Sequence, residues 1–573
     1  MNIEIMEKDK NGMKKNLTKA LLYPLLLIAI LRGITPFIYA IIDDRSMMEI
    51  LSGQYLGHPD PHAIFLGYWY SCILTGLYRI SVHVDWYGLL FLLVQWGCMS
   101  LILYRVQGQT EDRNVQDRRV ALTMVSFFLV GLQTVTQLTF TTTAAVVATT
   151  VLYWYVTSEK IEGKHFAVLF LLCFLTQQIR LEIFLMILPV CSLFWLIRLH
   201  RRGILGMGRW EVCLPMVAVT VLGIAFLGNM AGYGSPEWKA YNQYNQYRSD
   251  IYDYPDYTFP PYEEAEDLYA AAGIDTKSRA RTLINYDYVA DDQITPDFFE
   301  QYIRVYQQIR PSGQTRMDRL VESMKSYVKG VLDGRFHITQ SVGMVLLGIL
   351  LLMCIGKRKW TQAVEMGLLI GIQIVLWIYL LYKGRVPARV IYSMNLLLVT
   401  IVVLAWRECL HSVGEQIPNA FKRKGMTLLM LVLLGVGALY AKEIRTQNLA
   451  ISNRCEDVEK LKSFCAEHPE NFYFNDVTTM AFTTWDVKLW RNETYTMNYM
   501  SLGDWMSFSP LWKEKLEQQG ITSVREALYQ RDNVYLICTF DKGLEYLTSL
   551  YENTTCAEVD RAGLFHIYKL QSL

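Results

Sequence analysis

Long apolar runs recur along this 573-residue chain, and most approach the length that a helix needs to cross a bilayer. That length is about 20 residues, because the hydrocarbon core is about 30 Å thick and a helix rises about 1.5 Å per residue. Such runs are expected to be helical, since the bilayer offers no water to the backbone. The sequence predicts eleven spans, at 18–42, 84–104, 120–138, 142–157, 165–179, 181–198, 211–230, 337–356, 361–382, 388–406 and 425–441.

Basic residues between the runs predict which side of the membrane each loop faces. Cytoplasmic loops are enriched in Lys and Arg. The basic segments of this chain are the N-terminus, 105–119, 198–210, 357–359 and 407–424. Eleven spans with a cytoplasmic N-terminus place all of them inside and the C-terminus outside. We therefore expect a multi-pass protein of a cell membrane.

Segment 62–80 is apolar enough to suggest one more span. Counting it would put the basic loop 105–119 outside and reverse every later loop, against the charge bias. We therefore predict an interfacial or re-entrant helix here, rich in aromatic residues and packed on the outer face. Residues 43–83 then form the first outer loop.

Polar stretches divide the chain, so the expected fold class is mainly α, a transmembrane bundle with a C-terminal extracytoplasmic α/β domain. The predicted regions are an N-terminal bundle at 1–230, an outer helical and loop insertion at 231–336, further spans at 337–441 and the outer α/β domain at 442–573. The elements predicted in the polar stretches are helices at 296–309, 315–331, 454–466, 511–518 and 541–550 and strands at 471–474, 533–538 and 564–569.

Four cations fall at the outer ends of predicted spans, where the charge bias makes them unusual: Arg180, Lys383, Arg385 and Arg389. Three of them lie within seven residues, in a turn kept short by Gly and Pro. Arg385 and Arg389 have helical i, i+4 spacing, and Arg forks suit phosphate oxygens. The functional interpretation is a site for an anionic ligand at the outer leaflet. The alternative is that these side chains extend to lipid headgroups.

Acidic residues face the same side. Asp43 and Asp44 follow the first span, and Glu182 lies two residues after Arg180. A carboxylate beside the bilayer can act as a general base toward a hydroxyl, whereas a structural Asp there would cap a helix. In the functional interpretation, Glu182 orients Arg180 or contacts a sugar. In the alternative, Arg180 and Glu182 form an ion pair that only neutralises both charges.

The pattern His58-Pro-Asp60-Pro-His62 lies in the same outer loop. Three such side chains on an extended segment could bind a metal, but loop histidines more often form hydrogen bonds. We predict substrate contact for His58, Asp60 and His62 and no metal site, and leave a divalent cation open as a cofactor.

Composition and motifs exclude several functions. A net charge of +1 does not suit a nucleic-acid binder. The chain contains no Walker A motif, no G-x-G-x-x-G after a strand, no G-x-S-x-G and no C-x-x-C pair. ATP hydrolysis, Rossmann redox chemistry and hydrolase-elbow catalysis are therefore not indicated.

The layout resembles the GT-C superfamily of membrane glycosyltransferases and the polytopic proteins of bacterial surface-polysaccharide systems. The resemblance is carried by Asp43-Asp44 at the start of the first outer loop, by the apolar helix at 62–80 ending near Tyr78-Arg79, and by the trailing α/β domain. It implies a bacterial plasma membrane, a first-loop Asp as the base, and basic residues that hold a polyprenyl-phosphate sugar. The doubled Asp followed by Arg45 departs from many relatives, so either Asp is a candidate.

The predicted function is transfer of a sugar from a lipid-phosphate donor to a cell-surface glycan, glycolipid or protein. Asp43 or Asp44 would be catalytic, and Arg180, Glu182, Lys383, Arg385 and Arg389 would bind substrate. The alternatives are a flippase for lipid-linked sugars, a polysaccharide polymerase or ligase, and a non-catalytic envelope assembly protein.

Overall fold

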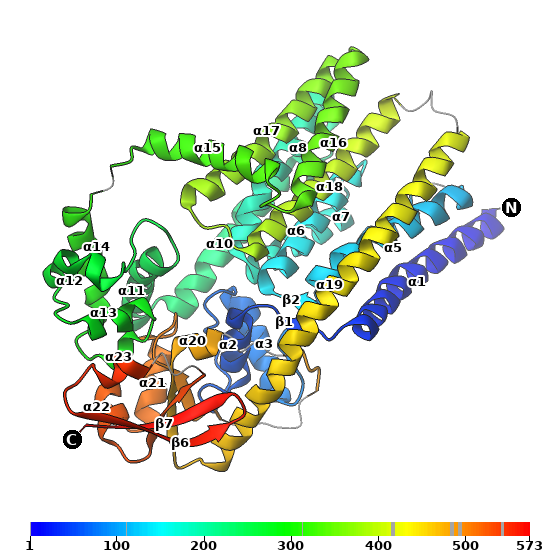
Figure 1. Ribbon diagram of the computed structural model, residues 1–573. Coiled ribbons are helices and arrows are strands. Elements are labelled where there is room, and N and C mark those ends of the chain that lie inside the picture. The colour runs from blue at the N-terminus through cyan, green and yellow to red at the C-terminus, as the bar shows by residue number, and fades with distance from the viewer. Residues whose placement is uncertain are drawn as a thin grey trace.

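The computed structural model describes residues 2–109, 112–311, 313–413, 419–481, 486–490, 496–539 and 544–572. A bundle of long helices meets two polar regions at one end, and the N- and C-termini lie far apart (Figure 1). We call the bundle end beside these polar regions the domain end, and the other the far end.

Each predicted span overlaps a helix, but the spans predicted at 18–42 and 120–138 extend past helices that end at Ile34 and Thr134. The helices that overlap the spans are α1 (Asn2–Ile34), α4 (Trp86–Gln107), α5 (Arg113–Thr134), α6 (Phe140–Thr157), α7 (Gly163–Ile179), α8 (Leu181–Arg202), α10 (Leu214–Tyr233), α16 (Ile338–Gly356), α17 (Trp360–Lys383), α18 (Ala388–Val413) and α19 (Asn419–Glu467). In the described part of the chain, eight are long and apolar enough to cross a membrane, namely α1, α4, α8, α10, α16, α17, α18 and α19. The protein is thus a mainly helical, multi-pass membrane protein, while the count of eleven and the orientation stay predictions.

Helix α6 lies inside the bundle, packed against α4, α7, α8 and α18. Its sequence explains this position, because small and Thr side chains allow close approach of neighbouring helices. Ala144, Ala148 and Thr150 are all buried, and the Thr150 hydroxyl donates to the Val146 carbonyl at 2.7 Å. Bonds of this kind to the preceding turn let a Thr-rich helix lie in an apolar interior, although the buried Thr141 hydroxyl has no described partner.

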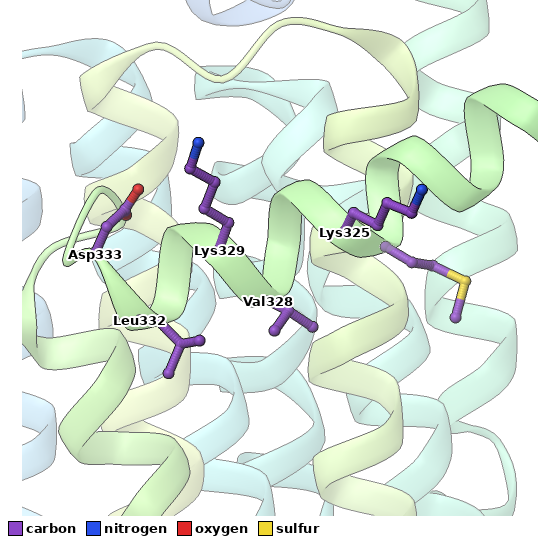
Figure 2. Close-up of a pocket in the computed structure, with 6 residues that line it drawn as sticks. Lys325, Val328, Lys329, Leu332 and Asp333 are labelled. Carbon is purple, nitrogen blue, oxygen red and sulfur yellow. The ribbon is translucent and has the colours of Figure 1, made fainter.

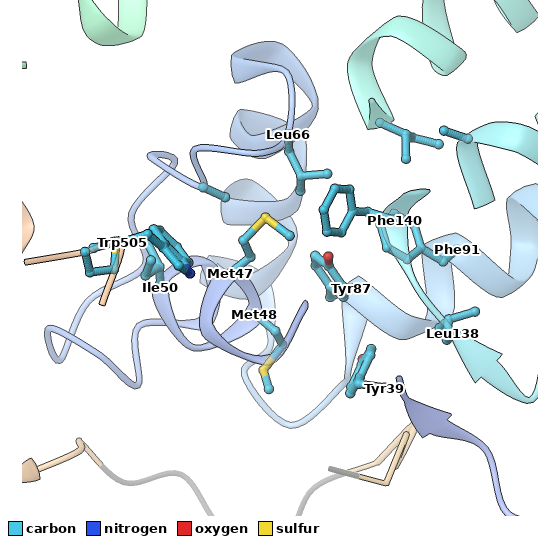
Figure 3. Close-up of a cluster of buried hydrophobic side chains, with 14 of the residues drawn as sticks. Tyr39, Met47, Met48, Ile50, Leu66, Tyr87, Phe91, Leu138, Phe140 and Trp505 are labelled. Carbon is cyan, nitrogen blue, oxygen red and sulfur yellow. The ribbon is translucent and has the colours of Figure 1, made fainter. Parts of the chain in front are cut away.

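A two-stranded parallel pair, β1 (Ile38–Tyr39) with β2 (Gln137–Leu138), ties the end of α1 to the start of α6. Two shorter helices follow β1, α2 (Ile42–Ser52) and α3 (Tyr68–Ile80). With 13 residues, α3 is too short to cross a bilayer, in keeping with its exclusion from the predicted spans. Aromatic and Met side chains from β1, α2, α4 and α6 form one buried cluster that Trp505 joins from the C-terminal region (Figure 3).

The insertion between α10 and α16 is helical. Its elements are α11 (Pro236–Tyr252), η2 (Tyr262–Glu264), α12 (Glu266–Ala271), α13 (Lys277–Ile284), η3 (Tyr288–Ala290), α14 (Pro296–Ile309) and α15 (Arg316–Leu332), while η1 (Ile204–Gly206) and α9 (Arg209–Val212) precede α10. The predicted helices at 296–309 and 315–331 are confirmed. Thr315 begins α15 with a capping box, since its hydroxyl accepts from the Asp318 N–H and the Asp318 carboxylate accepts in return.

The C-terminal region is a mixed sheet with helices, in strand order β4-β3-β5-β7-β6. Its elements are β3 (Phe472–Asn475), α20 (Val477–Ala481), β4 (Tyr499–Ser501), α21 (Pro510–Gln518), α22 (Val524–Gln530), β5 (Val534–Cys538), α23 (Leu544–Thr548), β6 (Thr554–Ala562) and β7 (Phe565–Ser572). β3 is parallel to β4 and β5, and β7 is antiparallel to β5 and β6. The predicted helix at 454–466 is not separate, because α19 runs unbroken through the expected boundary at 441–442. Residues 541–543 of another predicted helix lie outside the described residues.

Candidate functional site

A polar cavity of about 640 Å³ lies at the domain end of the bundle. Its walls come from α2, α11, the turn between α7 and α8, the loop between α17 and α18, and the segment around β3 and β4. Five residues predicted as site residues line it: Asp43, Arg180, Glu182, Arg385 and Arg389.

Asp43 and Arg389 form an ion pair on the cavity wall. The Oδ2 atom of Asp43, in the first turn of α2, lies 3.4 Å from Nη2 of Arg389. Arg389 is the second residue of α18, which follows a tight turn that begins at Gly384 with φ +78°. A Cβ at Gly384 would also lie 2.6 Å from the Pro255 ring, so this turn requires glycine.

Arg385 joins the same turn to the end of α11. Its Nη2 lies 3.1 Å from Oδ1 of Asp253, and its guanidinium carbon lies 5.8 Å from the centre of the Tyr254 ring. Lys383 is exposed at the end of α17 and is not among the described residues that line the cavity.

Arg180 occupies the extended residue between α7 and α8, with φ −159°. Its Nε lies 2.8 Å from Oε2 of Glu182. The guanidinium carbon lies 5.5 Å from the centre of the Phe65 ring and 5.0 Å from that of Phe140. Two aromatic rings and a carboxylate therefore hold this cation in one place beside the cavity.

The two adjacent aspartates differ in environment. Asp43 is partly exposed to the cavity, whereas Asp44 is fully buried and off its described walls. Asp44 Oδ1 accepts from the Tyr87 hydroxyl at 2.6 Å and from the Phe140 N–H at 2.9 Å. Burial raises the pKa of the Asp44 carboxyl to about 8, which favours its neutral form. Of the two candidate bases, the geometry therefore favours Asp43.

The histidines of the first loop are placed away from the described cavity walls. The His58 Nε2 atom lies 2.9 Å from Oε1 of Glu514. His62 Nδ1 lies 2.8 Å from Oδ1 of Asp60, and its Nε2 lies 2.9 Å from the Gly232 carbonyl oxygen. Both ring nitrogens of His62 thus have partners, and no group of three His, Cys, Asp or Glu residues within the described ranges could hold a metal. The motif is thus held by hydrogen bonds within the protein, and its contact with substrate stays a prediction.

The structure adds polar residues that were not predicted. Asn475 ends β3 and Ser501 ends β4, and the two are paired in register. Both line the cavity, at the carboxyl ends of parallel strands, where α/β proteins commonly bind ligands. Asn475 is 1% exposed, and its Oδ1 atom has no hydrogen-bond partner among the described residues. The sequence did contain a signal for Asn475, because it is a polar residue at the end of a predicted buried strand. Ser501 could not be found in this way, because β4 was not predicted.

Asp504 and Arg248 complete this part of the wall. Asp504 accepts from the backbone N–H groups of Met506 at 2.6 Å and Ser507 at 3.1 Å. Burial raises the pKa of its carboxyl to about 6. Arg248 is buried on α11, with Nη2 3.5 Å from Oδ2 of Asp253. Arg248 is the last residue of the Tyr-rich segment 241–248, and the sequence of that segment did not indicate that it lies near the other cations.

The cavity combines three kinds of group. Guanidinium groups of α11, α18 and the two turns can bind phosphate oxygens by paired hydrogen bonds. Each has a nearby carboxylate, so an anionic ligand has to compete with that carboxylate. Amide, hydroxyl and aromatic side chains of the C-terminal region can contact a polyhydroxylated group. No protein-family model, curated protein or solved structure matches the chain.

Proposed function

We propose that this protein is a membrane glycosyltransferase that moves a sugar from a lipid-phosphate carrier to a surface glycan, glycolipid or protein. The observation that carries the proposal is the approach of Asp43 to Arg389, at 3.4 Å, on a cavity that Arg180 and Arg385 also line. A carboxylate beside several guanidinium groups matches the needs of attack by a hydroxyl and departure of a phosphate.

The reaction we propose is a displacement at the anomeric carbon of the donor. Asp43 accepts the proton of the acceptor hydroxyl, whose oxygen forms the new glycosidic bond. The bond between the anomeric carbon and the phosphate oxygen breaks, and its electron pair leaves with the lipid phosphate. Arg389, Arg385 and Arg180 stabilise that charge. Glu182 orients Arg180.

The sugar would lie toward the C-terminal region. Asn475 offers a buried carbonyl oxygen without a described partner, and Ser501 and Asp504 lie on the same wall. Trp505, also on the cavity, can pack against the face of a sugar ring. In this proposal the α/β region selects the substrate and closes the cavity over it.

The proposal includes a topology. Eleven spans with a cytoplasmic N-terminus put the cavity on the outer side of a bacterial plasma membrane, where lipid-linked donors are exposed. The basic segments at the far end are then cytoplasmic, as the charge bias favours.

The test is transfer by the purified full chain in nanodiscs, using radiolabelled polyprenyl-phosphate sugars and an acceptor mixture. We expect Asp43→Asn to lower the rate at least about 100-fold, as loss of a general base does. Asp267→Asn, an exposed carboxylate with 68% side-chain exposure, is the matched control. Wild-type rates in Asp43→Asn would reject the mechanism. Transbilayer movement of a fluorescent lipid-linked sugar that survives Asp43→Asn, without transfer, would favour a flippase.

A further inference from the structure

Helix α15 carries an apolar stripe that the protein does not cover. The exposed side chains recur every three or four residues: Met317 66%, Leu320 37%, Val321 40%, Met324 49%, Val328 57% and Leu332 82% exposed. Lys325 and Lys329 point to one side of the helix, and Val328 and Leu332 to the other (Figure 2). The helix is therefore amphipathic along its whole length.

The stripe is not the face by which α15 packs on the bundle. That face is formed by Ser323, Tyr327 and Gly330, which are buried. The Tyr327 ring lies 6.5 Å from that of Trp377 in α17, and a Cβ at Gly330 would lie 2.3 Å from the Phe336 ring. The helix is thus fixed on α17 and presents its stripe outward.

The path of the chain places this stripe next to the end of a candidate membrane span. Only five residues separate Leu332 from Ile338, the first residue of the candidate span α16. Ile338 and Val345 are 65% and 62% exposed, so the apolar surface of α16 continues from the stripe. Figures 1 and 2 show α15 running across the spans, which is the direction of a helix lying in the bilayer plane.

The charge of α15 indicates the kind of lipid headgroup that it suits. α15 contains four basic and two acidic residues. Asp318 is used in the N-terminal cap, and Arg319 pairs with Asp256. Within the described residues, Lys325 and Lys329 form no ion pair, and both are exposed beside the stripe. Such cations next to an apolar face suit anionic headgroups.

We propose that α15 is an interfacial helix that buries this stripe among acyl chains, while Lys325 and Lys329 bind anionic lipid headgroups. It thereby connects the insertion that supplies α11 to the bilayer surface. The proposal depends on the membrane location of the bundle and not on sugar transfer.

The experiment uses the full chain in nanodiscs with an environment-sensitive fluorescent amino acid at position 324 or, as a control, at position 322 on the polar face. Lipids with a spin label on the upper part of the acyl chain should quench the probe at 324 at least about twofold more than the probe at 322, because only the former lies among acyl chains. Equal quenching at the two positions would overturn the proposal, because the stripe would then face solvent. A blue shift at 324 that appears only as protein concentration rises would also overturn it, because a second copy of the chain would then cover the stripe.

The lipid charge is tested with the same probe. Phosphatidylglycerol added to phosphatidylcholine should increase quenching at 324, and Lys325→Glu/Lys329→Glu should abolish that increase. The matched control, Lys239→Glu/Lys513→Glu, changes two exposed lysines elsewhere in the polar regions and should retain it. An unchanged response in the first variant would show that anionic lipids are not recognised by this helix.

Discussion

The two ends of helix α8 use arginine in different ways. At the far end, Arg198 has its Nη1 2.7 Å from Oε1 of Glu211, and its Nη2 donates to three backbone carbonyl groups at 2.7–2.9 Å. At the domain end, Arg180 has one carboxylate partner and two aromatic neighbours, and it lines a cavity.

The difference separates a structural arginine from one suited to a ligand. A guanidinium has five N–H donors in a fixed geometry. When carbonyl groups and a buried carboxylate occupy those donors, the side chain joins helices and has no capacity for a ligand. At the domain end the partner of Arg180 is the exposed carboxylate of Glu182, which the phosphate of the proposed donor can replace. The position of an arginine at the end of a span therefore does not show whether it is structural or available to a ligand. The groups that its N–H donors contact do show this.

The largest effect we expect is on stability at the far end. Arg198→Gln removes the guanidinium that lies 2.7 Å from the Glu211 carboxylate, which is 1% exposed, and leaves this carboxylate with Arg202 at 4.0 Å. Breaking such a buried pair costs about 3–5 kcal/mol of unfolding free energy. Thermal melting in detergent should show a large loss, whereas Arg209→Gln, an exposed arginine nearby, should melt like the wild type. Equal melting of both variants would contradict the structural role of Arg198.

Arg389→Gln should lower the rate of sugar transfer and have little effect on stability. Removing one donor to a leaving group costs about 10²–10³ in the rate of catalysis. Melting should change little, because Asp43 remains partly exposed to the cavity. Initial transfer rates and melting curves of the same preparation give the rate and the melting temperature. The control is Arg335→Gln, which changes an exposed arginine outside the described cavity walls. A fall in melting temperature as large as that of Arg198→Gln would remove the contrast between the two ends.

Local patterns in the sequence predicted much of the fold but little of how distant segments meet. The apolar runs gave the helices, and the amphipathic pattern gave α14 and α15 to within one residue. By contrast, α19 continues through the expected domain boundary, because no Gly or Pro breaks the segment where its composition changes from apolar to polar. Strands β4 and β6 were missed, since a three-residue strand has almost no periodicity and β6 is largely exposed.

The same limit applies to the site. Charge placed Arg180, Arg385 and Arg389 on one side of the membrane, and Asp43 with them. Their partner Asp253 and the cavity wall around Asn475 come from segments far along the chain, and only tertiary structure reveals them. Asp43 and Asp44 are adjacent in sequence, so only burial could separate them.

Asp44 gives a prediction about pH. Its pKa is raised from 3.8 to about 8, so the folded state binds a proton that the unfolded state releases. This contribution to stability is complete below the unfolded pKa and is lost as pH rises toward 8, by up to about 1.4 kcal/mol per pH unit. Asn is neutral throughout, so Asp44→Asn should gain about 2 kcal/mol relative to the wild type between pH 6 and 8. Melting at both pH values measures this, and a constant difference would show that Asp44 is ionised when buried.

The smallest effect compares two asparagines of the same sheet. Asn498 donates to the carbonyl groups of Cys465, His468 and Asn471 at 2.9–3.1 Å, as Arg198 does at the far end. The buried Oδ1 atoms of both asparagines have no described partner, but only Asn475 is among the described residues that line the cavity. Asn475→Ala should raise the KM for the sugar donor about tenfold at nearly constant kcat, the value of one or two hydrogen bonds. Asn498→Ala should lower the melting temperature and leave KM unchanged. If both variants change only stability, the C-terminal region closes the cavity without contacting the sugar.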